Sequence, residues 1–150
     1  MLNQKTIEVV KSTAPILKKY GPQITKRMYE IMFYNHPEVK EKFDMSAQAD
    51  GSQPARLASA IYSYASKIDD LPALKPMVER IAYRHVQTDV LPEEYSIVGS
   101  SLLQAMKDVL AEVVTDEVMV AWTEAYQALS DIFIAREYDI YEEQMSVLVR

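Results

Sequence analysis

Apolar residues recur every three or four positions along most of the chain, which places them on one face of an α-helix. This pattern predicts about six main helices and one short helix. The main helices are expected over residues 6–19, 22–35, 52–68, 74–86, 92–113 and 116–144, and the short one over residues 37–43. Residues 44–52 are polar and contain a glycine, so we expect a mobile connection there, with fraying after residue 144.

Local signals predict where these helices begin and end. Gly21 and Pro22 are expected to stop the first helix and to start the second. Ser52 is expected to cap the start of the next long helix, and Thr115 or Asp116 is available to cap the last one.

The composition favours an all-α fold in a single domain. Only 3 glycines and 7 prolines occur in 150 residues, which is too few for the tight reversals of a β-sandwich or a β-barrel. A chain of this length with 49% hydrophobic residues can bury one core. We therefore expect one domain over residues 1–150.

Charge and cysteine content exclude several classes of function. The lack of cysteine excludes disulfides, thiolate metal sites and cysteine nucleophiles, and it fits a reducing cytoplasm. A net charge of −6 without a block of Lys and Arg argues against nucleic acid and anionic membranes as partners. No secretion signal or membrane-spanning stretch is evident, so we expect a soluble cytoplasmic protein.

One histidine lies on an apolar helix face. His85 follows Met77 and Ile81 at spacings of four residues, so its imidazole is expected to point with those side chains and to be buried. A histidine in such a place is either a hydrogen-bonded core residue or a ligand. Spacing alone leaves both interpretations open.

The last predicted helix carries a carboxylate on its apolar face. Glu137 continues a seam whose other members are Trp122, Tyr126, Leu129, Phe133 and Ile140. A carboxylate buried there must be neutralised, hydrated or paired, because burying it alone costs several kcal/mol. In the alternative interpretation, the face that packs on the core is displaced by one residue, and Glu137 lies at a solvated edge beside Arg136.

Tyr95 is expected to meet both of these residues. It lies on the apolar face of the helix predicted over 92–113, so its ring should be inward and its hydroxyl should need a partner. Glu137 and His85 are the natural partners. A carboxylate that accepts the outer N–H of a metal-bound imidazole fixes the tautomer of that ring and increases its basicity.

Motifs dispersed over nearly the whole chain carry a family resemblance. They are Met1 to Ile7, Tyr29 to Phe33, His36 to Lys40, Lys42 to Met45, Gln53-Pro54, Ile68 to Leu74, Ile81-Ala82 with His85, Tyr95 to Gly99, and Ala121-Trp122 with Ala125-Tyr126. In these motifs the chain is similar to the bacterial single-domain haemoglobins and to the globin domain of flavohaemoglobins. Met28 departs from the pattern, since phenylalanine is common there. The chain stops at Arg150, where a flavohaemoglobin would begin its flavin and nicotinamide modules. The resemblance therefore implies a single globin domain without a reductase domain.

The resemblance also implies a haem b site and a role for each residue in it. His85 would be the proximal ligand of the haem iron, with Tyr95 and Glu137 as its hydrogen-bond partners. Tyr29 and Gln53, each unremarkable alone as a core tyrosine and a capping glutamine, would be polar groups on the distal side. The residues in contact with the ring or its propionates would be Phe43, Leu57 and Arg84, with a solvated surface charge as the alternative interpretation of Arg84.

A gas-binding function follows from this resemblance. Oxygen or nitric oxide would bind beside Tyr29 and Gln53, and oxidation of nitric oxide to nitrate would need a separate electron-donating reductase. The alternatives are a non-catalytic oxygen carrier or gas sensor, and a peroxidase-like haem protein. Enzyme activity and the choice between a monomer and a homodimer stay open.

Overall fold

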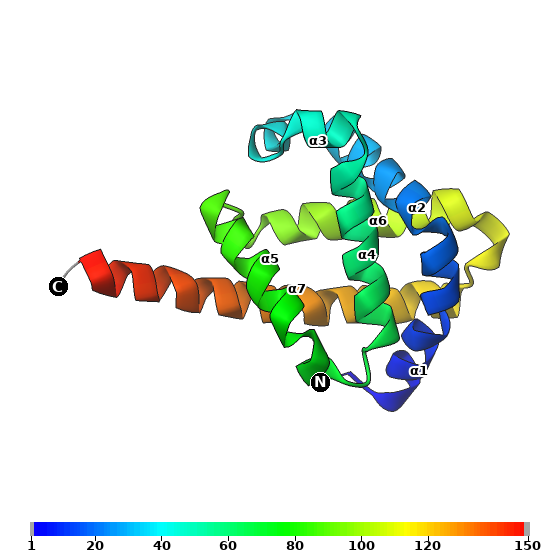
Figure 1. Cartoon of the computed structure of the whole chain (residues 1–150). Helices are drawn as coiled ribbons and strands as arrows, with labels where there is room; N and C mark the ends of the chain where they lie inside the picture. The colour runs from blue at the N-terminus through cyan, green and yellow to red at the C-terminus, as the bar shows by residue number, and fades with distance from the viewer. Residues whose placement is uncertain (1, 149–150) are drawn as a thin grey trace.

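The chain folds into α-helices and short 3-10 helices, and residues 2–148, which the structure describes, contain no β-strand (Figure 1). In this computed structural model the α-helices are α1 (Gln4–Ser12), α2 (Ala14–Asn35), α3 (Met45–Ala49), α4 (Ser52–Ser66), α5 (Lys75–Gln87), α6 (Glu94–Leu110) and α7 (Asp116–Leu148). The 3-10 helices are η1 (Pro37–Lys42), η2 (Leu71–Leu74) and η3 (Ala111–Val113). The predicted all-α fold is confirmed. No helix in the described range is both long and apolar enough to cross a membrane.

The boundary predicted at Gly21 and Pro22 is wrong. Helix α1 ends earlier, and α2 runs through Pro22 without a break. The start of α2 is marked instead by Pro15 in its first turn, where the missing N–H costs no helical hydrogen bond. Helix α2 packs closely on α4, since a Cβ added to Gly21 would lie 3.2 Å from the Cβ of Ala58. This tertiary packing outweighs the hydrogen bond that Pro22 removes.

The connection predicted over residues 44–52 contains the short helix α3. Asp44 caps this helix, because its Oδ1 accepts hydrogen bonds from the N–H groups of Ser46 at 3.0 Å and Ala47 at 3.4 Å. The prediction of Ser52 as an N-cap is wrong, because Gly51 takes the cap position of α4 and Ser52 is the first helical residue. The φ of Gly51 is 80°, a left-handed value that favours glycine.

The two C-terminal helices occur as predicted, with different ends. Helix α6 stops at Leu110, before η3, because Ala111 adopts a left-handed φ of 45°. Helix α7 begins after Thr115, whose Oγ1 accepts a hydrogen bond from the N–H of Val118 at 3.2 Å. Fraying was predicted after residue 144, but α7 continues to Leu148; residues 149 and 150 lie outside the described residues.

Buried apolar side chains form two clusters. The larger one joins α1, α2, α4, α6 and α7. Within it, Trp122 Nε1 donates to Thr13 Oγ1 at 3.0 Å, and the Tyr64 hydroxyl donates to the carbonyl of Ala125 at 2.7 Å. The smaller cluster lies between α5, the start of α6 and α7, and its buried members are Ala82, Val86, Tyr95, Phe133 and Ile140. The polar residues on which the sequence analysis depends lie at this smaller cluster.

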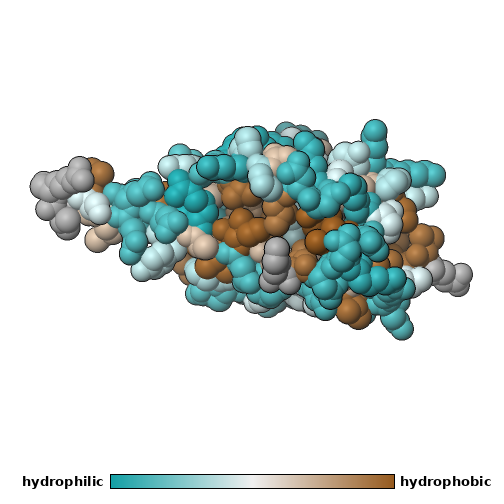
Figure 2. Space-filling view, turned by 90° about the horizontal axis from the view of Figure 1, so that it is seen from below, coloured by the Kyte–Doolittle hydropathy of each residue, from teal (hydrophilic) through white to brown (hydrophobic). Residues whose placement is uncertain are grey.

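A cavity of about 360 Å³ opens between η2, the start of α5, and α7. Its apolar lining includes Leu71, Leu74, Val78, Leu129 and Ile132. Figure 2 views the molecule from the side on which η2 lies in Figure 1, and it shows an apolar area within a polar surface. His85 is not among the residues that line this cavity.

Gly99 allows α6 and α7 to approach closely. The ring of Tyr126 lies against it, so that a Cβ added to Gly99 would lie 2.5 Å from Cε2 of Tyr126. The Tyr126 hydroxyl donates to the carbonyl of Tyr95 at 2.7 Å, which restrains the ring. This contact holds the first turn of α6 against α7.

We predict that Gly99→Ala lowers the free energy of unfolding by about 1–3 kcal/mol, because overpacking forces the Tyr126 ring away from α6. The higher helix propensity of alanine acts in the opposite direction. Urea unfolding followed by circular dichroism measures the difference, with Ser100→Ala at the neighbouring exposed position as the control. A Gly99→Ala protein as stable as the wild type would show that Tyr126 moves without cost.

Candidate functional site

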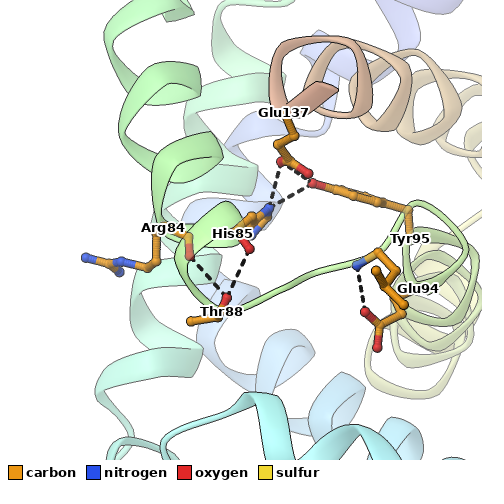
Figure 3. A network of polar contacts seen from close by, with 7 residues as sticks. Arg84, His85, Thr88, Glu94, Tyr95 and Glu137 are labelled. Carbon is orange, nitrogen blue, oxygen red and sulfur yellow. Dashed lines mark hydrogen bonds and ion pairs between the residues drawn. The ribbon is translucent and has the colours of Figure 1, made fainter. Parts of the chain in front are cut away.

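His85, Tyr95 and Glu137 meet at one point between three helices (Figure 3). Nδ1 of His85 lies 2.8 Å from the Tyr95 hydroxyl oxygen and 3.0 Å from Oε2 of Glu137. The Tyr95 hydroxyl donates to the same Oε2 at 2.6 Å. The predicted partners of Tyr95 are confirmed. Glu137 is only 4% exposed, so the interpretation that placed it at a solvated edge is wrong.

Each of these three residues comes from a different helix. His85 lies in the last turn of α5, Tyr95 in the first turn of α6, and Glu137 on the inward face of α7. The His85 ring packs on Phe133, with ring centroids 5.8 Å apart, and Phe133 stacks on Tyr95 at 6.3 Å. The His85 side chain keeps 28% of its surface exposed, so it is less buried than predicted. Its ring is therefore held by aromatic packing, while more than a quarter of the side-chain surface stays exposed.

The hydrogen bonds indicate which ring nitrogen of His85 carries the proton when the imidazole is neutral. Burial, followed by the hydrogen bond and charge of Glu137, raises the pKa of Tyr95 far above its usual range, so its hydroxyl stays protonated. That proton points to Glu137, and the carboxylate can only accept. In the neutral ring, Nδ1 of His85 therefore carries the hydrogen, which it donates to Glu137, and Nε2 has the lone pair. An imidazole in this state is the form that binds a metal.

The surroundings of His85 do not form a site for a bare metal ion. Within the described part of the chain, no group of three or more His, Cys, Asp or Glu side chains could hold one. Side chains of these four types would thus supply fewer than three ligands to a metal at Nε2 of His85. A metal at this nitrogen would need its other ligands from a non-protein group.

A second group of predicted residues gathers at the larger cluster. Tyr29 of α2 is buried, and its ring packs on Phe43 with centroids 5.5 Å apart and on Phe33 at 5.7 Å. Phe43, between η1 and α3, and Leu57 of α4 are partly buried and pack against the same cluster. Tyr29, Phe43 and Leu57 therefore belong to one apolar region, the larger cluster, in which the rings of Tyr29 and Phe43 are in contact.

Gln53 is joined to this region through a residue that the sequence analysis missed. Nε2 of Gln48, on α3, donates to the side-chain carbonyl oxygen of Gln53 at 2.9 Å. The Gln48 side chain also lowers the pKa of Tyr29, against the larger effect of burial. The missed signal was Asp44, a capping residue that begins a helical turn before Gln48.

Arg84 lies outside both groups. It is exposed, and Figure 3 shows its side chain directed away from Glu137 and Tyr95. Its carbonyl accepts a hydrogen bond from Thr88, while its guanidinium faces away from the described network. Its role beside a propionate stays a prediction.

Burial raises the pKa of Tyr29 to about 12. A tyrosine in the unfolded chain loses its proton near pH 10, so between pH 10 and about 12 the unfolded state binds fewer protons than the folded state. The free energy of unfolding must therefore fall as the pH rises through this window.

We predict that Tyr29→Phe makes this decline shallower. Within the window, the slope of the free energy of unfolding should change by up to about 1.4 kcal/mol per pH unit. Urea unfolding at a series of pH values between 9 and 12 measures the slope. Tyr34→Phe is the control, because Tyr34 is 87% exposed. Equal slopes for Tyr29→Phe and the wild type would contradict the prediction.

A comparison with known protein families identifies the family of this chain. A family model described as Globin matches residues 26–133. The chain belongs to the globin family. This globin is 46% identical over 142 residues to a flavohemoprotein of Halalkalibacterium halodurans, in a match that covers 95% of the chain and 34% of that protein. The chain thus spans only about a third of the length of this curated relative.

Two solved structures share the fold over nearly the whole globin. An engineered carbene transferase from Rhodothermus marinus, described as a candidate nitric oxide dioxygenase, has a TM-score of 0.89 and 29% identity, with 100% of both chains covered. The flavohemoglobin of Malassezia yamatoensis, with bound FAD and heme, has a TM-score of 0.87 and 31% identity. That match covers 94% of this chain and 38% of the flavohemoglobin chain. The predicted globin fold and the resemblance to flavohaemoglobins are confirmed.

Proposed function

We propose that this globin holds haem b through Nε2 of His85 and binds oxygen and nitric oxide beside Tyr29 and Gln53. The observation that carries the proposal is the contact of Nδ1 with Glu137 and Tyr95, which leaves Nε2 as the ligand atom. Membership of the globin family and the heme in the Malassezia flavohemoglobin support it.

The residues present fit haem. A porphyrin supplies four nitrogen ligands to its iron, which suits a histidine around which the described residues form no group of three or more His, Cys, Asp or Glu ligands. Phe43 and Leu57 are partly buried, and they offer the aromatic and aliphatic surface that a large apolar ring needs. In this proposal Arg84 pairs with a propionate at the exposed edge. Glu137 and Tyr95 orient the imidazole and increase its basicity.

Tyr29 and Gln53 are suited to act as hydrogen-bond donors to a bound gas. Haem, when bound, supplies the gas binding and the redox chemistry. The Tyr29 hydroxyl stays protonated at neutral pH because its pKa is about 12. The carbonyl oxygen of Gln53 is engaged by Gln48, which leaves the amide N–H groups of Gln53 to donate. Donors placed in this way stabilise negative charge that develops on a ligand.

We further propose that the globin oxidises nitric oxide to nitrate with a separate reductase. Nitric oxide, dioxygen and one electron balance to one nitrate ion, so each turnover draws one electron from the donor. The description of the Rhodothermus protein and the FAD in the flavohemoglobin structure support this choice. A non-catalytic carrier or gas sensor is the competing function.

We predict that the purified chain, reconstituted with hemin, takes up haem and shows a Soret band. His85→Ala should weaken haem affinity at least about tenfold, because the proximal nitrogen is lost. Optical titration measures the affinity, with excess cyanide as a distal ligand in parallel samples. The matched control is His36→Ala, which changes the second of the 2 histidines in the chain. A wild-type chain that stays colourless would contradict the proposed function.

We predict multiple turnovers of nitric oxide when a flavin reductase and NADH are supplied. Tyr29→Phe should lower the rate by about 10²-fold, because it removes a donor to the developing charge. Nitrate counted per haem measures the turnover, and Tyr34→Phe provides the control with an exposed tyrosine. One nitrate per haem and no more, despite rapid re-reduction, would favour the carrier.

A further inference from the structure

An ion pair connects two parts of the chain that the proposed haem site uses. Nζ of Lys42 donates to Oε1 of Glu94 at 2.6 Å and to the carbonyl of Asp89 at 2.6 Å. The same Oε1 of Glu94 accepts the N–H of Leu91 at 2.7 Å. The two charges thus organise three hydrogen bonds around one carboxylate and one ammonium group.

Lys42 and Glu94 are each adjacent in the chain to a residue of the candidate site. Lys42 is the last residue of η1 and directly precedes Phe43. Glu94 is the first residue of α6 and directly precedes Tyr95. Asp89 lies in the 88–93 loop, which connects the helix of His85 to the helix of Tyr95. The pair therefore ties the Phe43 segment to the loop between the two proximal residues.

Lys42 joins the 88–93 loop to a part of the chain outside α5 and α6. The backbone hydrogen bonds of the loop run to α5 and to α6. In the described part of the chain, Lys42 donates a side-chain hydrogen bond to the loop from outside these two helices, and Ser96 of α6 donates another to the carbonyl of Glu93 at 2.9 Å. Asp89 has a φ of 57°, a left-handed value that is strained for a residue with a side chain. The hydrogen bond from Lys42 to the Asp89 carbonyl stabilises this turn.

Burial distinguishes this pair from ordinary surface ion pairs. The side chains of Lys42 and Glu94 are 26% and 16% exposed, compared with 74% and 60% for Lys5 and Glu117. Exposed pairs contribute little because water and salt screen them, whereas partly buried pairs are screened less.

We infer that Lys42 and Glu94 are positioning residues that hold the 88–93 loop and thereby slow the loss of haem. The inference rests on the proposed function, because it takes Phe43 and His85 to be haem contacts. With the ion pair intact, the Phe43 segment and the start of α6 stay together, and the Tyr95 hydroxyl stays on Glu137. Without it, the loop keeps the hydrogen bonds to α5 and α6 and the apolar packing of Val90.

The test is the rate of haem transfer from the reconstituted protein to excess apomyoglobin. Lys42→Met and Glu94→Gln should each accelerate haem loss about fivefold. The double variant should be no faster than Lys42→Met alone, because Lys42→Met already removes the ion pair that Glu94→Gln weakens. Lys42→Arg should restore a slow rate, and Lys5→Met, at an exposed pair, should leave it unchanged. Glu94→Gln keeps an oxygen for the N–H of Leu91, so it isolates the effect of the charge.

A second readout separates positioning from general stability. In the ferrous protein, Lys42→Met should shift the iron–histidine stretching band measured by resonance Raman, because Tyr95 and Glu137 set the basicity of His85. The urea midpoint should fall by no more than the loss of one partly buried ion pair explains. Haem loss within about twofold of the wild type in both single variants, or additive effects in the double variant, would overturn the inference. An unshifted Raman band would overturn the positioning role.

Failure of the proposed function gives a different result. A wild-type chain that takes up no haem rejects the haem site, and amide hydrogen exchange in the haem-free protein then decides the role of the ion pair. Faster exchange confined to residues 88–94 in Lys42→Met supports positioning of the loop. Unchanged exchange there overturns it.

Discussion

The fold has to satisfy one buried carboxylate. Removing the Glu137 carboxylate from water without partners would cost several kcal/mol, and the loss of a single partner from such a group is strongly destabilising. Its donors come from two other helices, through the Tyr95 hydroxyl and Nδ1 of His85. Helices α5, α6 and α7 must therefore keep their relative positions within the tolerance of a hydrogen bond. The same constraint fixes the imidazole tautomer, so the packing of three helices and the chemistry of one nitrogen depend on the same contact.

Tyr95 is the residue where the supporting contacts converge. The Tyr126 hydroxyl reaches its carbonyl across Gly99, and the pair of Lys42 and Glu94 holds the loop that leads into it. No buried side-chain nitrogen or oxygen in the described residues lacks a hydrogen-bond partner. The partner of a buried polar side chain comes either from its own helix, as the carbonyl of Ile97 does for Ser101, or from another helix, as Glu137 does for Tyr95. Tyr29 and Phe43 belong to the larger apolar cluster, whereas Tyr95 belongs to the smaller one. The two groups of residues in the proposed site therefore depend on different buried clusters.

The wrong helix boundaries have a common cause. A Gly-Pro pair and a serine before an apolar run are local signals, and each is correct when the local chain decides the structure. At Pro22, packing of α2 on α4 contributes more than the one backbone hydrogen bond that proline removes. At Ser52, the backbone before α4 turns through a left-handed conformation that Gly51 adopts without strain. Gln48 was missed for a different reason. Its helix, α3, is too short to show an apolar period.

The sequence alone determined the all-α fold, the order of its long helices and the side on which His85 and Tyr95 lie, because helical periodicity is a property of neighbouring residues. It could not decide whether Glu137 was buried, because a shift of one residue along the seam moves a side chain from solvent to core. It also could not pair Lys42 with Glu94 or Gln48 with Gln53, since those contacts exist only after separate helices have docked. Tertiary structure decided them because hydrogen bonds and burial act between residues that chain spacing does not relate.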